Sequence, residues 1–451
     1  MFKPRQALAL SVFLISAFTA KGAWAAGPKE LEVGVVGYDL KPAIGIPLAG
    51  YGDTLRRLKP IDIKNKYPHS FFFKPSEGVH TAIRSKVMLL KKDGRKLVFV
   101  SIDSIGVEFR FIDAIAKKVA KLGIRHEDLI VSGTHTHSGP GTLSRRLPLE
   151  LVAVDLFIKK NFDAVVDGTV RSIELADQTA VPAELFNTSF IASGMQKNKF
   201  QRGAEWFNPE AQFLVARSKA TREWMGGMVN FAVHGGGMPI ELMLFSSDFP
   251  GQIEINIEKL LKQLNGPQSK QDVAILFMNG AEGDVAVPGR GVQLIEDLGA
   301  EFARQAAPAF TPARLKPVAP EFSVQQKKIW LGIPASPLKY CGEGILKKSP
   351  IPLRISLVPF MAQRAKISLV KVGEIAMMTW PGEASTTLGY ELQGVAKSRG
   401  YKTSWVLGLT NDYMTYFTTK KEYHQGAYDS CSSLFNFRGA ERIIKHYKSM
   451  L

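Results

Sequence analysis

Cysteine is scarce in this chain: Cys341 and Cys431 are the only two among 451 residues. No Cys-x-x-Cys pair occurs, so a metal site built from thiolates is not expected. The two thiols can join in one disulfide or can both remain reduced, and the sequence leaves these alternatives open.

Long apolar runs are missing beyond the first 26 residues. Within them, a short basic start precedes an apolar stretch from Ala7 to Ala20 and the small-residue cleavage pattern Ala23-Trp24-Ala25. This arrangement is typical of a signal peptide, and the apolar stretch is short for a membrane anchor. We therefore expect residues 1–26 to direct export, with residues 27–451 forming a periplasmic or secreted protein.

Acidic residues are few relative to basic ones, 41 against 58, which gives a formal net charge of +17. A basic surface favours anionic partners, including membranes with acidic headgroups. Zinc fingers, aromatic-studded RNA motifs and long basic helices are all missing, so nucleic acid is not an expected partner. Repeats, low-complexity tracts and Pro/Ser linkers are missing as well, which favours one large catalytic unit.

Hydrophobic patterning predicts an α/β fold with mixed elements. Strand–helix–strand spacing between residues 97 and 133 predicts a parallel α/β unit, and a hairpin is expected around Thr221 to Glu223. The expected strands span residues 32–36, 85–90, 97–102, 129–133, 211–218, 225–233, 274–278, 366–380 (a hairpin) and 403–409, and the expected helices span 109–122, 151–175, 250–264, 293–306 and 435–448.

The segment Thr134 to Gly141, Thr-His-Thr-His-Ser-Gly-Pro-Gly, is the most informative part of the chain. It follows an apolar strand, and residues two apart in an extended segment point to the same face. His135 and His137 should therefore project together at a strand end, where open α/β sheets place their sites. Paired imidazoles suit metal binding or acid–base chemistry, and the alternative is two polar loop residues bonded to backbone and water.

Further polar residues follow predicted strands in the same way. His234 precedes three glycines, and a ligand role and a structural role are both open. Glu383 begins a helix, where an acid is also favoured by the helix dipole. Asp103 is a candidate hydrogen-bond partner for a histidine or a turn residue. The loop Asn279–Asp284 carries two acids at another strand end.

Together these segments resemble the catalytic domain of the neutral/alkaline non-lysosomal ceramidases. Thr134–Gly141 is similar to that family's zinc signature. Similar segments occur in family order between residues 36 and 435, among them Ala232-Val233-His234, Gly283-Asp284-Val285, Pro381-Gly382-Glu383 and Asn411-Asp412-Tyr413. The resemblance implies a single large zinc-hydrolase domain over residues 27–451, without the C-terminal β-sandwich that usually follows in the family.

Carried over residue by residue, the resemblance implies one zinc ion held by His135, His234, Glu383 and Tyr416. His137 is then the catalytic imidazole that protonates the departing amine, and the phenol of Tyr416 also stabilises the developing oxyanion. Two imidazoles and a carboxylate are ligand types of hydrolytic zinc sites, which keep a position open for water.

Two positions depart from the family pattern. The family's Gly-Asp-Val-Ser ends here in Ala286, whose methyl group can neither attack a carbonyl nor donate a hydrogen bond. The family's Asn-Arg pair is matched by Asn198-Lys199, and lysine keeps the charge but loses planar, bidentate bonding. The substrate can therefore differ from ceramide.

The leading hypothesis is an exported zinc amidohydrolase that cleaves the N-acyl bond of ceramide or a similar lipid, giving a fatty acid and a sphingoid base or amine. One alternative is a lipid-binding relative whose catalysis is impaired by Ala286. Another is a barrel-type metal hydrolase, which also uses His-x-His but needs two further histidines. Apart from His234, only His424 and His446 remain for that role, in late and basic segments.

Overall fold

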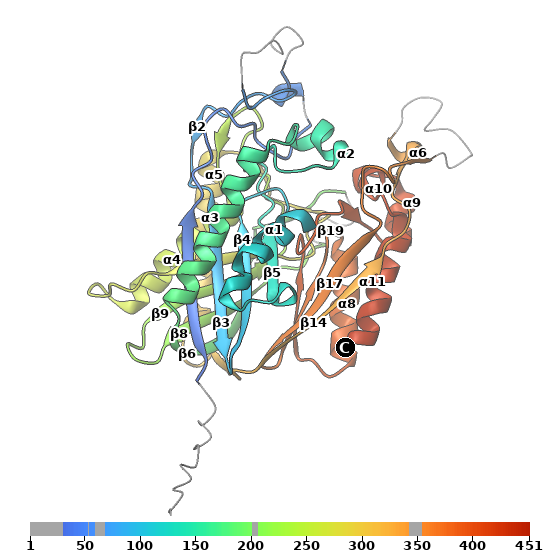
Figure 1. Ribbon diagram of the computed structural model, residues 1–451. Coiled ribbons are helices and arrows are strands. Elements are labelled where there is room, and N and C mark those ends of the chain that lie inside the picture. Colours follow the sequence, from blue (N-terminus) through green and yellow to red (C-terminus); the bar gives the residue numbers. More distant parts are fainter. Residues whose placement is uncertain (1–29, 53, 59–67, 201–205, 342–353) are drawn as a thin grey trace, which may run out of the picture.

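Two β-sheets packed face to face form the centre of the protein, with helices on both outer faces (Figure 1). The computed structural model describes residues 30–52, 54–58, 68–200, 206–341 and 354–451. Within these ranges the larger sheet has nine strands and the smaller has four. The predicted mixed α/β fold is confirmed, whereas the signal peptide predicted at residues 1–26 lies outside the described residues.

The larger sheet has the strand order β11-β9-β8-β6-β1-β3-β4-β5, and β13 pairs with β6. Val98 and Val100 of β4 face the helices, while Leu97 and Phe99 face the second sheet. Because both faces are covered, such strands appear in the sequence as continuous apolar runs. The strands are β1 (Glu32–Asp39), β3 (Arg84–Lys92), β4 (Arg95–Ile102), β5 (Leu129–Gly133), β6 (Val181–Ile191), β8 (Glu210–Ser218), β9 (Trp224–Phe231), β11 (Ala274–Asn279) and β13 (Lys316–Val318).

The smaller sheet has the order β14-β17-β18-β20. Its strands are β14 (Phe322–Trp330), β17 (Arg364–Val372), β18 (Ile375–Thr379) and β20 (Thr403–Leu407). Short strands pair outside the two sheets and shape the loops around the site. They are β2 (Gly78–Val79) with β10 (Leu244–Phe245), β7 (Lys197–Asn198) with β12 (Val285–Ala286), β15 (Ala335–Pro337) with β16 (Arg354–Ser356), and β19 (Glu383–Ala384) with β21 (Tyr416–Phe417).

Helices complete a four-layer α/β/β/α arrangement. The larger sheet is covered by α1 (Phe109–Val119), α3 (Lys159–Gln178), α4 (Asp248–Asn265) and α5 (Val292–Ala306), and the smaller sheet by α8 (Thr386–Ser398) and α11 (Asn436–Met450). The short helices are α2 (Leu147–Leu149), α6 (Leu338–Cys341), α9 (Lys420–Gln425) and α10 (Tyr428–Ser432). No helix in the described part of the chain is long and apolar enough to cross a bilayer.

Within the two main sheets, as far as the structure describes them, three strand pairs are parallel, namely β4–β5, β9–β11 and β18–β20. The first pair confirms the parallel unit predicted between residues 97 and 133, and the antiparallel pairing of β8 with β9 confirms the predicted hairpin. Parallel strands bring their carboxyl ends to one edge of a sheet, so the loops that follow them are gathered there.

The helix predicted at 151–175 is interrupted: residues 151–154 belong to a π-helical turn (Glu150–Val154), and α3 begins only at Lys159. Asp155 adopts a left-handed backbone conformation with φ of 64°, which ends the preceding turn. Its carboxylate accepts hydrogen bonds from the backbone N–H groups of Phe71, Phe72 and Phe73. The loop that carries Phe71, Phe72 and Phe73 is therefore held against this turn, with Phe73 buried and Phe71 exposed.

The two cysteines form a disulfide between α6 and α10. This settles the alternative that the sequence left open. The bond joins two segments that are 90 residues apart in the chain.

Candidate metal centre

Polar side chains from five strand ends meet in one place. His135 and His137 follow β5, His234 follows β9, and Glu282 follows β11. Glu383 comes from β19, which follows β18, and Tyr416 comes from β21, which follows β20. β19 and β21 pair in parallel, with Glu383 opposite Tyr416. The site therefore lies at the carboxyl edge of both sheets.

The backbone at His135 is not the extended segment that the sequence suggested. Its φ of 67° lies in the left-handed region, a conformation that non-glycine residues adopt at a cost. The His137 N–H donates to the carbonyl of Gly235 at 2.7 Å, which fixes the two histidine loops together. A Cβ at Gly235 would lie 2.4 Å from the His135 carbonyl oxygen, so only glycine permits this approach.

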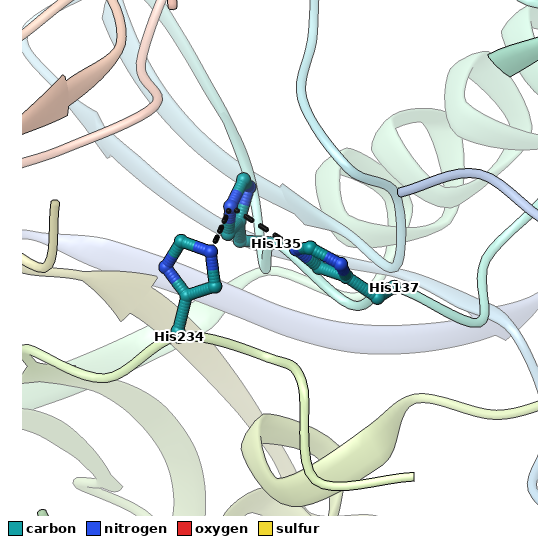
Figure 2. Close-up of side chains that lie close together, drawn as sticks. All are labelled: His135, His137 and His234. Carbon is teal, nitrogen blue, oxygen red and sulfur yellow. Dashed lines mark hydrogen bonds between the residues drawn. The ribbon is translucent and has the colours of Figure 1, made fainter. Parts of the chain in front are cut away.

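Three imidazoles point toward one another, as Figure 2 shows. The Nε2 atoms of His135 and His234 are 3.2 Å apart, and those of His135 and His137 are 3.5 Å apart. His135 donates its Nδ1 proton to the carbonyl of Ile105 at 2.6 Å, and His234 Nδ1 donates to Glu282 Oε2 at 2.8 Å. Both Nε2 lone pairs consequently face the same point, an arrangement that a cation between them would stabilise.

Two buried carboxylates complete the cluster. Glu383 Oε2 lies 3.4 Å from His135 Nε2, and Glu383 Oε1 accepts a 2.7 Å hydrogen bond from the Tyr413 hydroxyl. Glu383 Oε2 and Glu282 Oε1 accept no hydrogen bond from any residue that the structure describes. Buried carboxylate oxygens rarely lack partners, so these two are candidates for a metal or water contact.

The residues fit a divalent metal ion. Ligand atoms of His135, His234, Glu282 and Glu383 all lie within 4.8 Å of one another. Metal–nitrogen bonds of about 2.0–2.1 Å in tetrahedral geometry place two ligand nitrogens about 3.3 Å apart, close to the observed spacing. With its Nδ1 bonded to Glu282, His234 has the carboxylate–histidine pairing that orients metal ligands.

Electrostatics keep two of the imidazoles neutral. Burial, together with neighbouring cations such as Lys199, holds the pKa of His234 well below its usual value, and burial with the charge of His135 does the same for His137. At His135 the effect of burial is outweighed by Glu383 and Glu282, which raise its pKa. Neutral imidazole is the form that binds metal.

Tyr416 and Lys199 border the cluster. The Tyr416 hydroxyl lies 3.5 Å from His234 Nε2, and Lys199 Nζ lies 3.4 Å from that hydroxyl. Burial and the charge of Glu383 raise the pKa of Tyr416 well above 10, so its phenol stays protonated and can donate a hydrogen bond. On the opposite side, the ring of Tyr51 packs on His137 with 4.4 Å between centroids.

A cavity of about 430 Å³ opens onto the cluster. His135, His137, Glu383 and Tyr416 form its polar floor, and its walls are mostly apolar. The apolar wall residues are Ile105, Pro148, Leu149, Val152, Ala153, Val154, Leu357, Met361 and Leu434. Such a cavity suits a ligand with an alkyl chain and a polar group at one end.

The structure thus brings together all five residues that the sequence singled out as ligands or catalysts (His135, His137, His234, Glu383 and Tyr416). The expectation for Asp103 as a histidine partner is wrong, because its carboxylate pairs with the buried Lys86 at 2.8 Å. The roles of Glu282 and Tyr413 were missed. Glu282 lies in the loop Asn279–Asp284, which the sequence analysis noted at a strand end. Its position after a strand, like that of His135 and His234, was the signal that could have placed it in the site.

Known proteins share this sequence pattern and architecture. The profile described as "Neutral/alkaline non-lysosomal ceramidase, N-terminal" matches residues 70–299 and 349–442. Neutral ceramidase B of Dictyostelium discoideum is 21% identical over 92% of this chain and 71% of its own length. The neutral ceramidase of Pseudomonas aeruginosa is 23% identical over 79% of this chain and 65% of its own length.

A crystal structure of neutral ceramidase from Pseudomonas aeruginosa superposes with a TM-score of 0.76 and 19% identity, covering 93% of this chain and 74% of that one. At this identity the match supports the fold. The profile match extends over most of the chain and includes all five site residues. The chain belongs to the neutral/alkaline non-lysosomal ceramidase family.

Proposed function

We propose that this protein is a metal-dependent amidohydrolase that cleaves the N-acyl bond of ceramide or a similar lipid, releasing a fatty acid and a sphingoid base or amine. The observation that carries the proposal is the convergence of imidazoles and carboxylates on the floor of an apolar cavity. The family's named relatives support the same substrate class.

One zinc ion held by His135, His234, Glu383 and Tyr416 fits these side chains. When bound there, zinc would polarise an amide carbonyl and make water acidic enough to react near neutral pH. The role of Glu282 is to hold His234 in the orientation and tautomer that present Nε2. Ala286 offers no hydroxyl, so no serine nucleophile acts at that position.

Two residues handle charge and protons in the reaction. The phenol of Tyr416 donates a hydrogen bond to the oxygen that becomes negative in the transition state. His137, which lines the cavity and is neutral at rest, accepts a proton from the attacking water and passes it to the departing amine nitrogen. The apolar walls hold the alkyl part of the substrate and keep bulk water from the reacting atoms.

We also propose that the protein contacts an anionic membrane surface. Val152 lines the cavity and is 53% exposed, and its neighbour Leu151 is also exposed. The guanidinium of Arg57 donates to the Leu151 carbonyl at 2.9 Å. Apolar and basic groups therefore adjoin the mouth, in a protein with net charge +17. Export to the periplasm or the medium would place the protein where such surfaces occur.

The direct test combines metal analysis with substrate screening. The purified protein is assayed with fluorescent ceramides and other N-acyl amides, with a chelator and after zinc is added back. Turnover that the chelator abolishes and zinc restores supports the proposal. A metal-loaded protein that hydrolyses none of these amides would instead support the lipid-binding alternative, which the family relationship does not favour.

Tyr416→Phe is expected to lower kcat by about 10²–10³-fold, because it removes a hydrogen-bond donor to the developing oxyanion. The free energy of unfolding, measured by urea denaturation, should change by about 1 kcal/mol or less. Tyr401→Phe, outside the site, serves as the matched control. Equal kcat in Tyr416→Phe and wild type would remove Tyr416 from the mechanism.

Zinc affinity is expected to rise with pH. A proton competes with zinc at His135, whose pKa the carboxylates of Glu383 and Glu282 raise above 6.5 against the effect of burial. The dissociation constant should fall by up to about tenfold per pH unit below that pKa and level off above it. Competition with a chelator of known protonation constants, between pH 5.5 and 8.5, measures this. A flat profile would mean that His135 releases no proton on binding.

A further inference from the structure

A second, smaller cavity lies beside the cavity of the candidate metal centre, and we call it the inner cavity. It has a volume of about 30 Å³ and is enclosed mainly by apolar side chains of α1, of α3 and of the loop that follows β4. Polar groups in its lining bond to neighbouring groups: the Ser144 hydroxyl donates to the Glu108 carboxylate, and the Ser104 hydroxyl donates to the Gly106 carbonyl at 3.2 Å. Such a space suits alkyl groups better than water.

The wall between the two cavities is made of side chains that line both of them. These side chains are buried and belong to one apolar cluster, so they contact one another across the wall. They are Ile105, Leu149, Val154 and Tyr413. The inner cavity is therefore a continuation of the larger cavity that these four side chains close off.

Half of this wall also supports the metal centre. The Ile105 carbonyl accepts the Nδ1 proton of His135 at 2.6 Å, and the Tyr413 hydroxyl donates to Glu383 Oε1 at 2.7 Å. The other half comes from α2 and the π-helical turn, which contribute the apolar side chains of Leu149 and Val154. Leu149 and Val154 can therefore be exchanged without removing a hydrogen bond of the centre.

The segment that carries Leu149 and Val154 is fixed at both ends. Before it, the Arg146 guanidinium donates to the Asp412 carboxylate at 2.6 Å. After it, the Asp155 carboxylate accepts three backbone N–H groups of the loop that carries the three phenylalanines. The backbone of the wall is thus held by contacts that do not involve the two apolar side chains, so a shorter side chain leaves open space rather than a moved segment.

We propose that Leu149 and Val154 set the length of the alkyl chain that the larger cavity accepts. The inference rests on the proposed function, since it requires that this cavity binds an N-acyl lipid. An alkyl chain that runs from the reacting amide toward this side ends at the wall, because further methylenes would have to displace close-packed side chains. A methylene that a pocket admits or excludes changes kcat/KM by about tenfold or more.

The alkyl chain can come from either side of the amide, as the fatty acyl chain or as the chain of the sphingoid base or amine. Two series of N-acyl amides distinguish these sources. In one series the acyl chain is lengthened by two carbons at a time on a constant amine, and in the other series the amine chain is lengthened on a constant acyl group. The series in which a wall variant changes the preferred length identifies the chain that meets the wall.

The experiment measures kcat/KM over both series for wild type, Leu149→Ala and Val154→Ala. Leu149→Ala replaces an isobutyl group by a methyl group and joins the two cavities. It is expected to shift the preferred length in one series by about two to four carbons, and to raise kcat/KM at least about tenfold for chains longer than wild type prefers. Val154→Ala removes fewer atoms and should shift the same series by a smaller amount.

Leu143→Ala is the matched control. Leu143 lines the inner cavity but is not among the described residues that line the larger one, so its truncation enlarges the inner cavity and leaves the wall in place. This variant should keep the wild-type dependence on chain length. The proposal is overturned if both wall variants keep the wild-type profile in both series, or if Leu143→Ala shifts it as much as Leu149→Ala. Wild type that hydrolyses no member of either series would instead refute the proposed function.

Discussion

His135→Ala is expected to remove the bound metal and to lower amide hydrolysis by at least about a thousandfold. His135 Nε2 is within 3.5 Å of side-chain atoms of His234, His137 and Glu383, so it is the central member of the cluster. Its loss leaves one imidazole, one carboxylate and one phenol from the proposed ligand set, a combination that should hold zinc much more weakly than the complete one. In the proposed mechanism the ion activates both the carbonyl and the attacking water, so its loss should remove most of the turnover.

Metal content by elemental analysis and turnover of a fluorescent N-acyl amide measure the two effects separately. His234→Ala should behave in the same way, because its Nε2 faces the same point. His446→Ala, in α11 and outside the centre, is the matched control and should keep both metal and activity. Full metal occupancy in His135→Ala and His234→Ala would refute the ligand assignment.

Local sequence patterns were enough to predict much of the fold. Apolar runs bounded by glycine and polar residues marked β4, β5, β9 and β11 closely, because strands covered on both faces are strongly apolar. The stacking of the two sheets could not be predicted in this way. It depends on contacts such as those of Phe99 with the smaller sheet's face, between residues far apart in the chain.

The candidate site was predicted where a side chain directly follows a strand. His135, His137 and His234 all do so, and the parallel strand pairs bring them to one edge. Tyr413 was not recognised as a partner of Glu383, because their hydrogen bond joins residues 30 positions apart through a turn that no local pattern reveals. Such long-range pairings depend on the packed fold.

The rule that a polar residue directly after a strand belongs to the site is wrong for Asp103. It also follows a strand end, but its carboxylate turns toward the sheet interior and meets Lys86, a fully buried lysine of β3. The sequence around a lysine in an apolar strand does not identify the carboxylate that pairs with it. Here the partners are Asp103 and, from α4, Glu254.

Lys86→Met is expected to destabilise the protein by about 3–5 kcal/mol, because it removes the cation in direct contact with two buried carboxylates and leaves Glu254 only the Arg84 guanidinium at 3.8 Å. Lys86 Nζ lies 2.8 Å from Asp103 Oδ1 and 2.6 Å from Glu254 Oε2, and all three side chains are buried. Glu254 Oε1 also accepts from the Phe277 N–H at 2.8 Å, so the network joins β3, α4 and β11. Urea denaturation measures the change in the free energy of unfolding.

Lys91→Met is the matched control on the same strand, since Lys91 pairs with Glu32 near the surface and its loss should cost about 1 kcal/mol or less.

The destabilisation caused by Lys86→Met should also depend on pH. Burial already raises the pKa of Glu254 from 4.5 to about 7, against the opposing effect of Lys86. Without Lys86 the folded-state pKa rises further, so folding is penalised increasingly as pH rises from 4.5 through that raised pKa. Lys86→Met should therefore be closer to wild type at pH 5 than at pH 8. A loss below about 1 kcal/mol at both pH values would show that the buried carboxylates do not depend on this lysine.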